Sequence, residues 1–549
     1  MLKTQEEMIV KFIKKIMAIA ISLVMALTLC VPALAEGNGA DGDTTGSTTT
    51  VNTYKITAPA ADGKYKDHQY EIYQIFTATI TKEDGKDILT DEKWGANAKN
   101  GNDAVTVGDS VPEAVLNELK GLNSESDTEK LKVITKYVNL NSTPVATLSN
   151  GSSYDAVPGY YLIKDKDNTV SGNDSYTLYV VKVVDGDLTI APKAEVPSFE
   201  KKIKDTNDTT GVTSGWQDSA DYDIGDQVPF QLKGTVASDY DNYKTYYFAF
   251  HDKEEDGLTF NADSVKVYVD GNLIENTADK TYYTVNTSCT DGCTFEVVFN
   301  NLKDIASVKA GSEITVEYTS ELNKKANIGS EGNVNQGKLE FSNNPNEEQN
   351  GTDKPGTGET PWDNVIVFTY QVIVNKVDEN KKPLTGAEFT LIKKVAQTDA
   401  EGNIVKDAEG NTVYTEEVID VIKSTDGTTF TFKGLDDGDY ILRETKTPTG
   451  YNTIDDIEFT VNADHTIDWD GLNRTGVLTG LSGNVTTGNI TFTANTDKGS
   501  LSTDVVNKKG VELPSTGGIG TTIFYVIGGL MMAAAAVLFV TKKRLESNK

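Results

Sequence analysis

An apolar run near the carboxyl end sets the strongest limit on how this chain can fold and where it lies. Residues 523–540 contain no charged side chain, and a helix of that length, rising about 1.5 Å per residue, just crosses a hydrocarbon core of roughly 30 Å. The cations Lys542, Lys543 and Arg544 follow directly, and such cations stay on the cytoplasmic side. The sequence therefore predicts a membrane span that leaves nearly the whole chain outside the cell.

A short motif precedes this run. It consists of Leu513, Pro514, Ser515, Thr516 and Gly517. Pro514 favours an extended segment, and Gly517 leaves the preceding peptide bond uncrowded. An apolar tail with basic residues would by itself be a plain membrane anchor, but the order of pentapeptide, span and basic tail resembles the LPxTG sorting signal of Gram-positive surface proteins. That resemblance implies a sorting signal over 513–549, in which a sortase cysteine attacks the Thr516 carbonyl.

The amino end carries the features of a secretory signal. Lysines precede an apolar stretch at 16–31, and small residues follow at Ala33 and Ala35. This pattern predicts a signal peptide over 1–35, cleaved after Ala35. Residues 36–50 are rich in Gly, Asp and Thr and predict a flexible mature terminus.

Two cysteines remain after that cleavage, Cys289 and Cys293. Outside the cell, a pair this close around an Asp-Gly step favours a disulfide at a hairpin tip over a metal site, because the sequence offers no second pair of ligands. The three histidines are scattered along the chain, which leaves little material for a zinc site or a histidine-based hydrolase. We expect no metal and no cofactor.

Length and charge limit the organisation and the partners. The 549 residues predict roughly three domains of 100–200 residues each besides the end segments. The formal net charge is -31 and 24% of the residues are charged. This acidic balance argues against nucleic acid and against anionic membrane surfaces as partners.

Turn and linker signals divide the chain between its ends. Strands rich in β-branched and aromatic residues, separated by Asp-Gly and Asn-Gly turns, predict an all-β protein of tandem β-sandwiches, the first with short helical insertions between 111 and 138. The predicted parts are an N-terminal domain at 51–190, a proline-bounded connector at 191–197, a second domain at 198–345, a polar linker at 346–361 and a third domain at 362–508.

Polar residues interrupt the apolar faces of strands in the second and third domains. By the strand period of two, one polar residue on each of three strands points to the apolar side. In the second domain these are Lys201, Asp252 and Asn343, and in the third domain they are Lys376, Glu444 and Asn507. Each set offers a lysine first, a carboxylate in the middle and an asparagine last.

These sets have the chemistry of a self-forming cross-link. Desolvation lowers the pKa of a buried lysine, which leaves a neutral and nucleophilic amine. It raises the pKa of a carboxyl in the same pocket, which can then pass a proton to departing ammonia. We expect the lysine and asparagine of each set to join in an intramolecular isopeptide bond, assisted by the carboxylate. The alternative is a buried salt bridge capped by an asparagine, or a set with solvent-facing members.

Segments 376–378, 383–389 and 440–451 resemble the CnaB-type domain of sortase-assembled pilins. The last segment is similar to the E-box of that family, whose glutamate corresponds to Glu444, and Asn507 matches the asparagine of the final strand. The resemblance implies immunoglobulin-like, Cna-type sandwiches.

The second domain resembles the fimbrial isopeptide-forming domain of the same family. The matching segments are 224–230, 256–260 and 341–345. This resemblance implies the acid role for Asp252. In the first domain we find no comparable set of lysine, acid and asparagine.

The connector carries one further lysine, Lys193. A lysine between prolines is by itself merely solvated, but Ala191-Pro192-Lys193 resembles the pilin motif, in which the lysine amine attacks the sortase acyl-enzyme. Ala191 stands where the family has a tyrosine. The resemblance implies that the Thr516 carbonyl passes to Lys193 of another copy, and repetition gives a covalent fibre.

The resemblance covers nearly the whole precursor and implies the backbone subunit of a secreted, wall-attached pilus that supports adhesion. The implied partners are a pilin-specific sortase, other copies of the chain, minor pilins, and peptidoglycan through a housekeeping sortase; the membrane is contacted only by the precursor. The rival is a monomeric wall-anchored adhesin, or a tip or base subunit, in which Lys193 is inert. A secreted enzyme would need a further catalytic constellation, and the sequence shows none.

Overall fold

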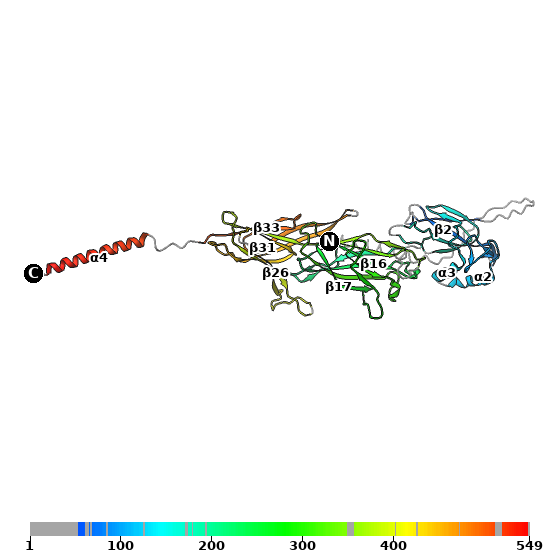
Figure 1. The fold of residues 1–549 in the computed structure, drawn as a ribbon, viewed down its shortest axis with the longest axis horizontal. Coiled ribbons are helices and arrows are strands. Elements are labelled where there is room, and N and C mark those ends of the chain that lie inside the picture. Colours follow the sequence, from blue (N-terminus) through cyan, green and yellow to red (C-terminus); the bar gives the residue numbers. More distant parts are fainter. Residues whose placement is uncertain are drawn as a thin grey trace, which may run out of the picture. The chain divides into compact units, whose positions relative to one another are not determined.

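The computed structural model describes residues 53–60, 65, 68–83, 86–124, 127–170, 174–177, 179–192, 195–347, 356–400, 402–423, 426–470, 473–510 and 519–546. The predicted signal peptide, the flexible mature terminus, Lys193 and the pentapeptide 513–517 lie outside these residues. The chain is built mainly of β-strands in several sheets (Figure 1), as the sequence predicts.

The first module combines two main sheets with short helices. One sheet has the order β10-β1-β7 and the other the order β3-β2-β8-β9, with β6 paired to β2. The strands are β1 (Tyr54–Thr57), β2 (Tyr70–Glu83), β3 (Lys86–Trp94), β6 (Ala146–Leu148), β7 (Ser153–Ala156), β8 (Gly159–Asp165), β9 (Val180–Val184) and β10 (Leu188–Thr189), with a small pair β4 (Lys99–Asn100) and β5 (Asp103–Ala104). Helices α2 (Glu113–Lys120) and α3 (Asp127–Ile134) and two short 3₁₀ turns occupy the predicted helical insertion.

The second module is a sandwich of two sheets around an aromatic-rich core. The first sheet contains β11 (Ser198–Ile203), β15 (Gln227–Thr235), β21 (Glu313–Leu322), β17 (Leu258–Val269) and β18 (Asn272–Ile274) in that order. The second contains β14 (Ser219–Asp221), β24 (Asp363–Phe368), β22 (Asn333–Ser342), β16 (Phe248–Glu254), β20 (Phe295–Phe299) and β19 (Thr284–Asn286), with β23 (Thr357–Glu359) paired to β22. A small pair, β12 (Thr206–Asn207) and β13 (Val212–Thr213), lies beside them.

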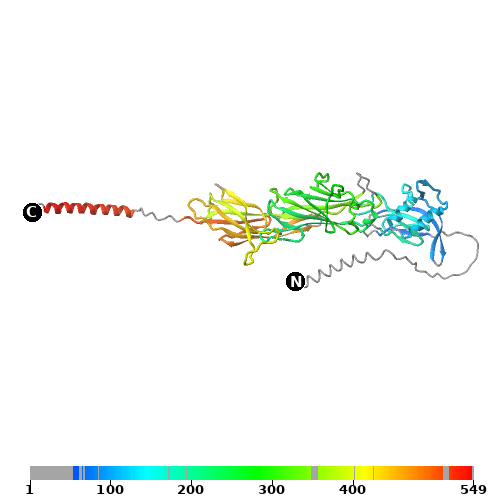
Figure 2. The same ribbon diagram turned by 90° about the horizontal axis from the view of Figure 1, so that it is seen from below.

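The third module is a second sandwich (yellow to orange in Figure 2). Its first sheet contains β28 (Thr429–Leu435), β25 (Tyr370–Asp378), β33 (Ser500–Asn507) and β32 (Thr493–Asn495), and its second contains β27 (Tyr414–Lys423), β26 (Glu388–Ala396), β29 (Gly438–Lys446), β30 (Ile457–Asp470) and β31 (Asn473–Thr487). The first strand β25 and the last strand β33 run parallel as neighbours. This pairing sets the first and last strands of the module side by side.

Strand β24 connects the two sandwiches. The sequence predicts this strand in the third domain at 362–508, but β24 pairs with β22 and β14 in the sheet of the second module. Val365 and Val367 pack in the second core, whereas Ile366 and Phe368 pack in the third. Because its successive side chains enter two cores, no solvent-facing alternation marks a boundary there.

Helix α4 (Ile519–Glu546) follows the third module and contains the predicted apolar run 523–540. Among the helical residues whose side chains the structure describes, no segment reaches the length and apolarity needed to cross a membrane.

Candidate isopeptide sites and a charged junction

The third module brings together the three residues that the sequence singled out. Lys376 on β25 and Asn507 on β33 are both fully buried. The Lys376 ammonium or amine nitrogen, Nζ, donates to the Asn507 side-chain oxygen Oδ1 and to the Val505 carbonyl at 3.0 Å. The parallel pairing of first and last strand therefore places the amine against the carboxamide.

Glu444 on β29 lies on the other side of that carboxamide. Its two oxygens each accept a hydrogen bond from Asn507 Nδ2 at 3.0 Å, and its Oε1 lies 3.8 Å from Lys376 Nζ. The Thr447 hydroxyl and the Ile454 N–H hold Glu444 Oε2 at 3.1 and 3.3 Å. The amine faces the carbonyl oxygen and the acid faces the amide nitrogen, which is the order that amide exchange requires.

The environment of Lys376 favours the neutral amine. Burial lowers the pKa of Lys376 to about 8, although the nearby Glu444 charge acts in the opposite direction. A lowered pKa leaves more of the lysine without its proton near neutral pH, and only that form is a nucleophile.

In the second module the structure joins Lys201 to the predicted acid. Lys201 on β11 and Asp252 on β16 have fully buried side chains, and Lys201 Nζ donates to Asp252 Oδ2 and to the Tyr318 hydroxyl at 2.8 Å. The same hydroxyl donates to Asp252 Oδ2 at 2.5 Å. Burial lowers the pKa of Lys201 and raises the pKa of Asp252, with each group's charge opposing the shift of the other.

Asn343 does not lie beside Lys201, so the predicted partner needs correction. Asn343 Nδ2 donates instead to the Asp174 carbonyl of the first module at 3.3 Å. The fully buried Asn335 takes the place near the lysine, because its Nδ2 donates at 2.9 Å to the same Tyr318 hydroxyl. A Cβ added at Gly337, two residues along β22, would lie 3.3 Å from Lys201 Cδ.

The period of two explains the error. Positions 335 and 343 have the same parity, but Asn343 lies one residue past the end of β22, and eight residues of extended chain separate the two positions by about 27 Å. The pairing of β16 with β22 sets Asp252 opposite Gly337 and Glu254 opposite Asn335. Alternation therefore indicates which face a residue lies on, whereas its position along the strand depends on the register between strands, which alternation does not determine.

Glu254 and Tyr318 are site residues that the sequence analysis missed. Glu254 Oε1 lies 3.4 Å from Asn335 Nδ2. Burial, together with the nearby Asp252 charge, raises the pKa of Glu254 to about 8. A second carboxyl that holds a proton near neutral pH thus lies beside the amide nitrogen.

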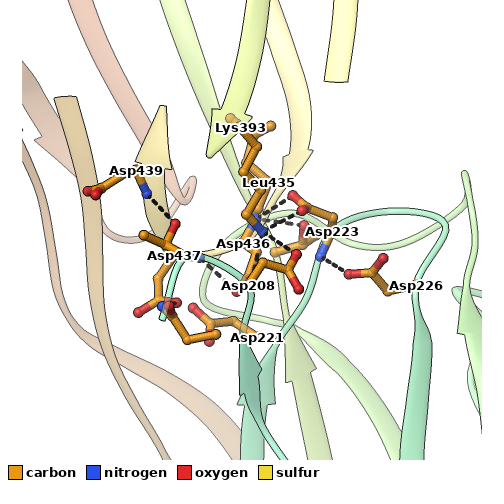
Figure 3. A network of polar contacts seen from close by, with 12 residues as sticks. Asp208, Asp221, Asp223, Asp226, Lys393, Leu435, Asp436, Asp437 and Asp439 are labelled. Carbon is orange, nitrogen blue, oxygen red and sulfur yellow. Dashed lines mark hydrogen bonds and ion pairs between the residues drawn. The ribbon is translucent and has the colours of Figure 1, made fainter. Parts of the chain in front are cut away.

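A different lysine site joins the second and third modules. Lys393 on β26 is almost fully buried and contacts three carboxylates at once (Figure 3). Its Nζ lies 2.6 Å from Asp223, 2.8 Å from Asp208 and 3.1 Å from Asp436. Burial alone would lower the pKa of Lys393, but the three carboxylates together raise it well above its ordinary value.

Backbone contacts reinforce this junction. The Asp436 N–H donates to Asp223 Oδ1 at 2.9 Å, and the Ile224 N–H donates to the Gly434 carbonyl at 3.0 Å. No sequence pattern predicts this site, because its acids come from loops in two modules. The disulfide predicted from the sequence is present: Cys289 and Cys293 are bonded in the loop between β19 and β20.

Comparisons with known proteins agree with this architecture. Residues 370–475 match the SpaA family, a prealbumin-like fold domain, and residues 505–546 match the LPXTG cell wall anchor motif. The chain is 25% identical over 453 residues to the trypsin-resistant surface T6 protein of Streptococcus pyogenes serotype M6, covering 72% of this chain and 77% of that protein.

Solved pilins are also similar. The T6 backbone pilin of serotype M6 Streptococcus pyogenes is 18% identical with a TM-score of 0.49, over 85% of this chain and 100% of the other. The full-length major pilin SpaD of Corynebacterium diphtheriae is 16% identical with a TM-score of 0.44, over 83% of this chain and 98% of the other.

The SpaA-type module and the anchor that follows it define a class of protein, the secreted surface proteins that sortases attach to the cell wall. Within that class the chain is similar to the T6 surface protein and to the solved major pilins.

Proposed function

We propose that the chain is the repeating backbone subunit of a covalent pilus, and that its second and third modules each close with an internal Lys–Asn isopeptide bond. The observation that carries this proposal is the arrangement of Lys376, Glu444 and Asn507. A buried amine of lowered pKa, a carboxamide and a carboxyl meet in one dry pocket of the module. Such fixed proximity replaces a bimolecular encounter with an effectively unimolecular step.

The reaction balances without any added reagent. The Nζ lone pair of Lys376 attacks Cγ of Asn507, and a C–N bond forms. The bond from Cγ to Nδ2 breaks, and Glu444 carries the proton that the lysine loses to the departing nitrogen. One amine and one primary amide become one secondary amide and one ammonia.

For the second module we assign the same reaction to Lys201 and Asn335, in place of the Asn343 that the sequence suggested. Asp252 contacts the amine and Glu254 contacts the amide nitrogen. Asp252 Oδ1 and Asn335 Oδ1 are both buried without a hydrogen-bond partner. A proton held by Asp252, whose pKa burial raises, could supply the missing donor.

The two bonds would give the subunit its mechanical role. In the third module the bond would join β25 to β33, the first and last strands of the sandwich. Tension applied to the ends of the module would then pass through a covalent link. Sheet hydrogen bonds, each worth only about 0.5–1.5 kcal/mol net, would carry little of it.

Intact mass tests the internal bonds. The mature chain should weigh less than its sequence by two ammonia molecules. Asn335→Ala should show a deficit of only one, whereas the matched variant Asn343→Ala should keep both. A full deficit in Asn335→Ala, or no deficit in the wild type, would contradict the assignment.

Polymerisation rests on Lys193 and Thr516, with the LPXTG match and the connector pattern in support. A pilin-specific sortase would cleave after Thr516 and pass its carbonyl to Lys193 of another copy, and minor pilins and a housekeeping sortase would complete and anchor the fibre. Lys193→Arg, expressed with its sortase, should give monomer in boiling detergent. The exposed Lys166→Arg should keep the high-mass ladder, and a ladder in both variants would favour a different acceptor lysine.

A further inference from the structure

A histidine in the second module, His251, faces two carboxylates, and none of these three residues belongs to an isopeptide site. His251 on β16 is directly opposite Glu296 on β20, and Asp291 lies in the loop that precedes β20. The histidine ring nitrogen Nδ1 lies 3.0 Å from Asp291 Oδ2 and 3.5 Å from Glu296 Oε1. The His251 side chain is only 6% exposed, yet Nδ1 makes no hydrogen bond.

The other polar atom of each of these side chains is already held. His251 Nε2 lies 3.2 Å from Glu340 Oε2, Asp291 Oδ1 accepts the Cys293 N–H at 3.1 Å, and Glu296 Oε2 accepts from Asn286 Nδ2 at 2.9 Å. A ring N–H donated to Glu340 leaves the Nδ1 lone pair directed at two carboxylate oxygens. That arrangement is repulsive unless a cation lies between them.

From this geometry we infer a binding site for one divalent transition-metal ion, with His251 Nδ1, Asp291 Oδ2 and Glu296 Oε1 as ligands. Zinc is the best chemical match, because it accepts imidazole and carboxylate ligands in a tetrahedral site. Bonds of about 2.0–2.1 Å in a tetrahedron put neighbouring ligand atoms about 3.3 Å apart, close to the two measured separations. A water molecule would complete the coordination.

The surrounding contacts are those of an oriented metal site. Protein ligands to zinc commonly have their outer atoms fixed by a second set of hydrogen bonds, as Glu340, Asn286 and the Cys293 backbone do here. The Cys289–Cys293 disulfide closes the loop that carries Asp291. Cys293 Sγ lies 3.8 Å from Glu296 Oε1, but the disulfide removes its thiolate from the ligand set.

Nearby cations do not fill this place. Lys338 Nζ lies 3.9 Å from Asp291 Oδ2, but it donates to Glu359 at 2.7 Å instead. The histidine of the third module, His465, differs from His251 because both of its ring nitrogens have partners. Its Nδ1 lies 2.9 Å from Ser219 Oγ, and its Nε2 lies 3.4 Å from Asp221 Oδ1. Likewise, the carboxylates of the junction cluster already hold the Lys393 ammonium.

Calorimetric titration of the mature oxidised chain with zinc chloride, after treatment with a chelator, tests the site. We expect one equivalent to bind at micromolar or lower concentration and to raise the midpoint of thermal unfolding. His251→Gln and Asp291→Asn should each weaken binding at least tenfold, whereas His465→Gln should bind like the wild type. Asp291 lies in a partly exposed loop, so its variant should fold even if His251→Gln does not.

Two results would overturn the inference. One is wild-type protein that binds no zinc below millimolar concentration, which would mean that a proton on His251 balances the two carboxylates. The other is unchanged binding in a folded Asp291→Asn variant, which would place the zinc elsewhere. Neither result would affect the isopeptide assignment, because that depends on the mass deficit alone.

Discussion

Lys376 and Lys393 are both buried lysines of the third module, but their surroundings make them opposite in chemistry. Lys376 faces one carboxylate at 3.8 Å and a carboxamide in direct contact. Lys393 has three carboxylate oxygens within 3.1 Å. Burial lowers the pKa of Lys376 to about 8, whereas the three carboxylates hold the pKa of Lys393 well above its ordinary value.

The difference shows that the number of nearby carboxylates, rather than burial alone, decides what a buried lysine does. With a single acid, desolvation prevails and the amine becomes a nucleophile. With three, the ammonium is stabilised and cannot attack, even though carboxyl carbons lie next to it. Lys393 therefore acts as an ionic clamp between modules, whereas Lys376 has the surroundings of the reactant that we propose within one module.

The largest effect should come from removing the acid at the reactive lysine. Glu444→Gln should block the bond between residues 131 positions apart. Cross-linking a loop of that size stabilises a fold by about 5 kcal/mol in chain-entropy terms, so thermal unfolding should fall sharply and the mass should rise by one ammonia. Glu416→Gln, at an exposed site of β27, should change neither. An unchanged mass deficit in Glu444→Gln would contradict the proposed role of Glu444 in the reaction of Lys376.

Removing the clamp should cost nearly as much stability but leave the mass unchanged. Lys393→Met leaves the buried carboxylates of Asp223 and Asp436, and the partly exposed one of Asp208, without their cation. Breaking a buried ion pair in this way destabilises by about 3–5 kcal/mol. Denaturant unfolding followed by a probe at the junction should report the loss, while mass spectrometry still finds the full ammonia deficit. The double variant Lys393→Met with Asp436→Asn should recover part of the loss. A lost ammonia deficit in Lys393→Met would mean that the two sites are coupled.

The clamp should also depend on pH, in a direction set by its outer acids. Burial raises the pKa of Asp226 to about 7, and the neighbouring Asp223 and Asp208 charges of the clamp add to this shift. Burial also raises the pKa of Asp205 to about 7, where the added charges are those of Asp221 and Asp437 beside the clamp. Unfolded aspartates titrate near 4, so between about pH 4 and 7 the folded state binds more protons than the unfolded one. Stability from these groups is therefore complete at low pH and is lost as pH rises through 7.

Thermal unfolding of the mature chain at pH 5 and pH 7.5 checks this sign. The free energy of unfolding should be greater at pH 5 by on the order of 2 kcal/mol from this cluster. Asp226→Asn keeps the side-chain oxygen that accepts the Asp223 N–H at 3.1 Å and should reduce the pH slope. An increase in stability toward pH 7.5 that Asp226→Asn does not alter would contradict the expectation.

The contrast between the lysines also marks what sequence alone could provide. Alternation and the resemblance to the CnaB-type domain both indicate Lys376, Glu444 and Asn507, and the pairing of the first strand with the last brings the lysine and the asparagine together. Asn335 was missed because alternation gives a face but not a position along it. The fold class followed from short strands and turns, which are local signals.

The remaining features arise from contacts between distant segments. Lys393 sits on an ordinary strand pattern, and its acids come from loops more than 150 residues away as well as from its own module. His251 on β16 also meets residues from another part of the chain: Glu296 lies on the paired strand β20, and Asp291 lies in the loop before β20. No local sequence periodicity predicts such contacts between distant residues, so they become visible only in the folded structure.

The smallest effect should come from an exposed lysine that pairs with a single carboxylate. Lys446 lies two residues after Glu444 on β29 and pairs with Glu388 at 3.1 Å, but its side chain is 53% exposed. Water solvates this ammonium, so the pair should contribute less than about 1 kcal/mol. Lys446→Ala should therefore leave the ammonia deficit intact and barely change denaturant unfolding. A loss of stability comparable to that of Lys393→Met would show that a nearby carboxylate stabilises a lysine even without burial. Burial would then not explain the difference between these lysines.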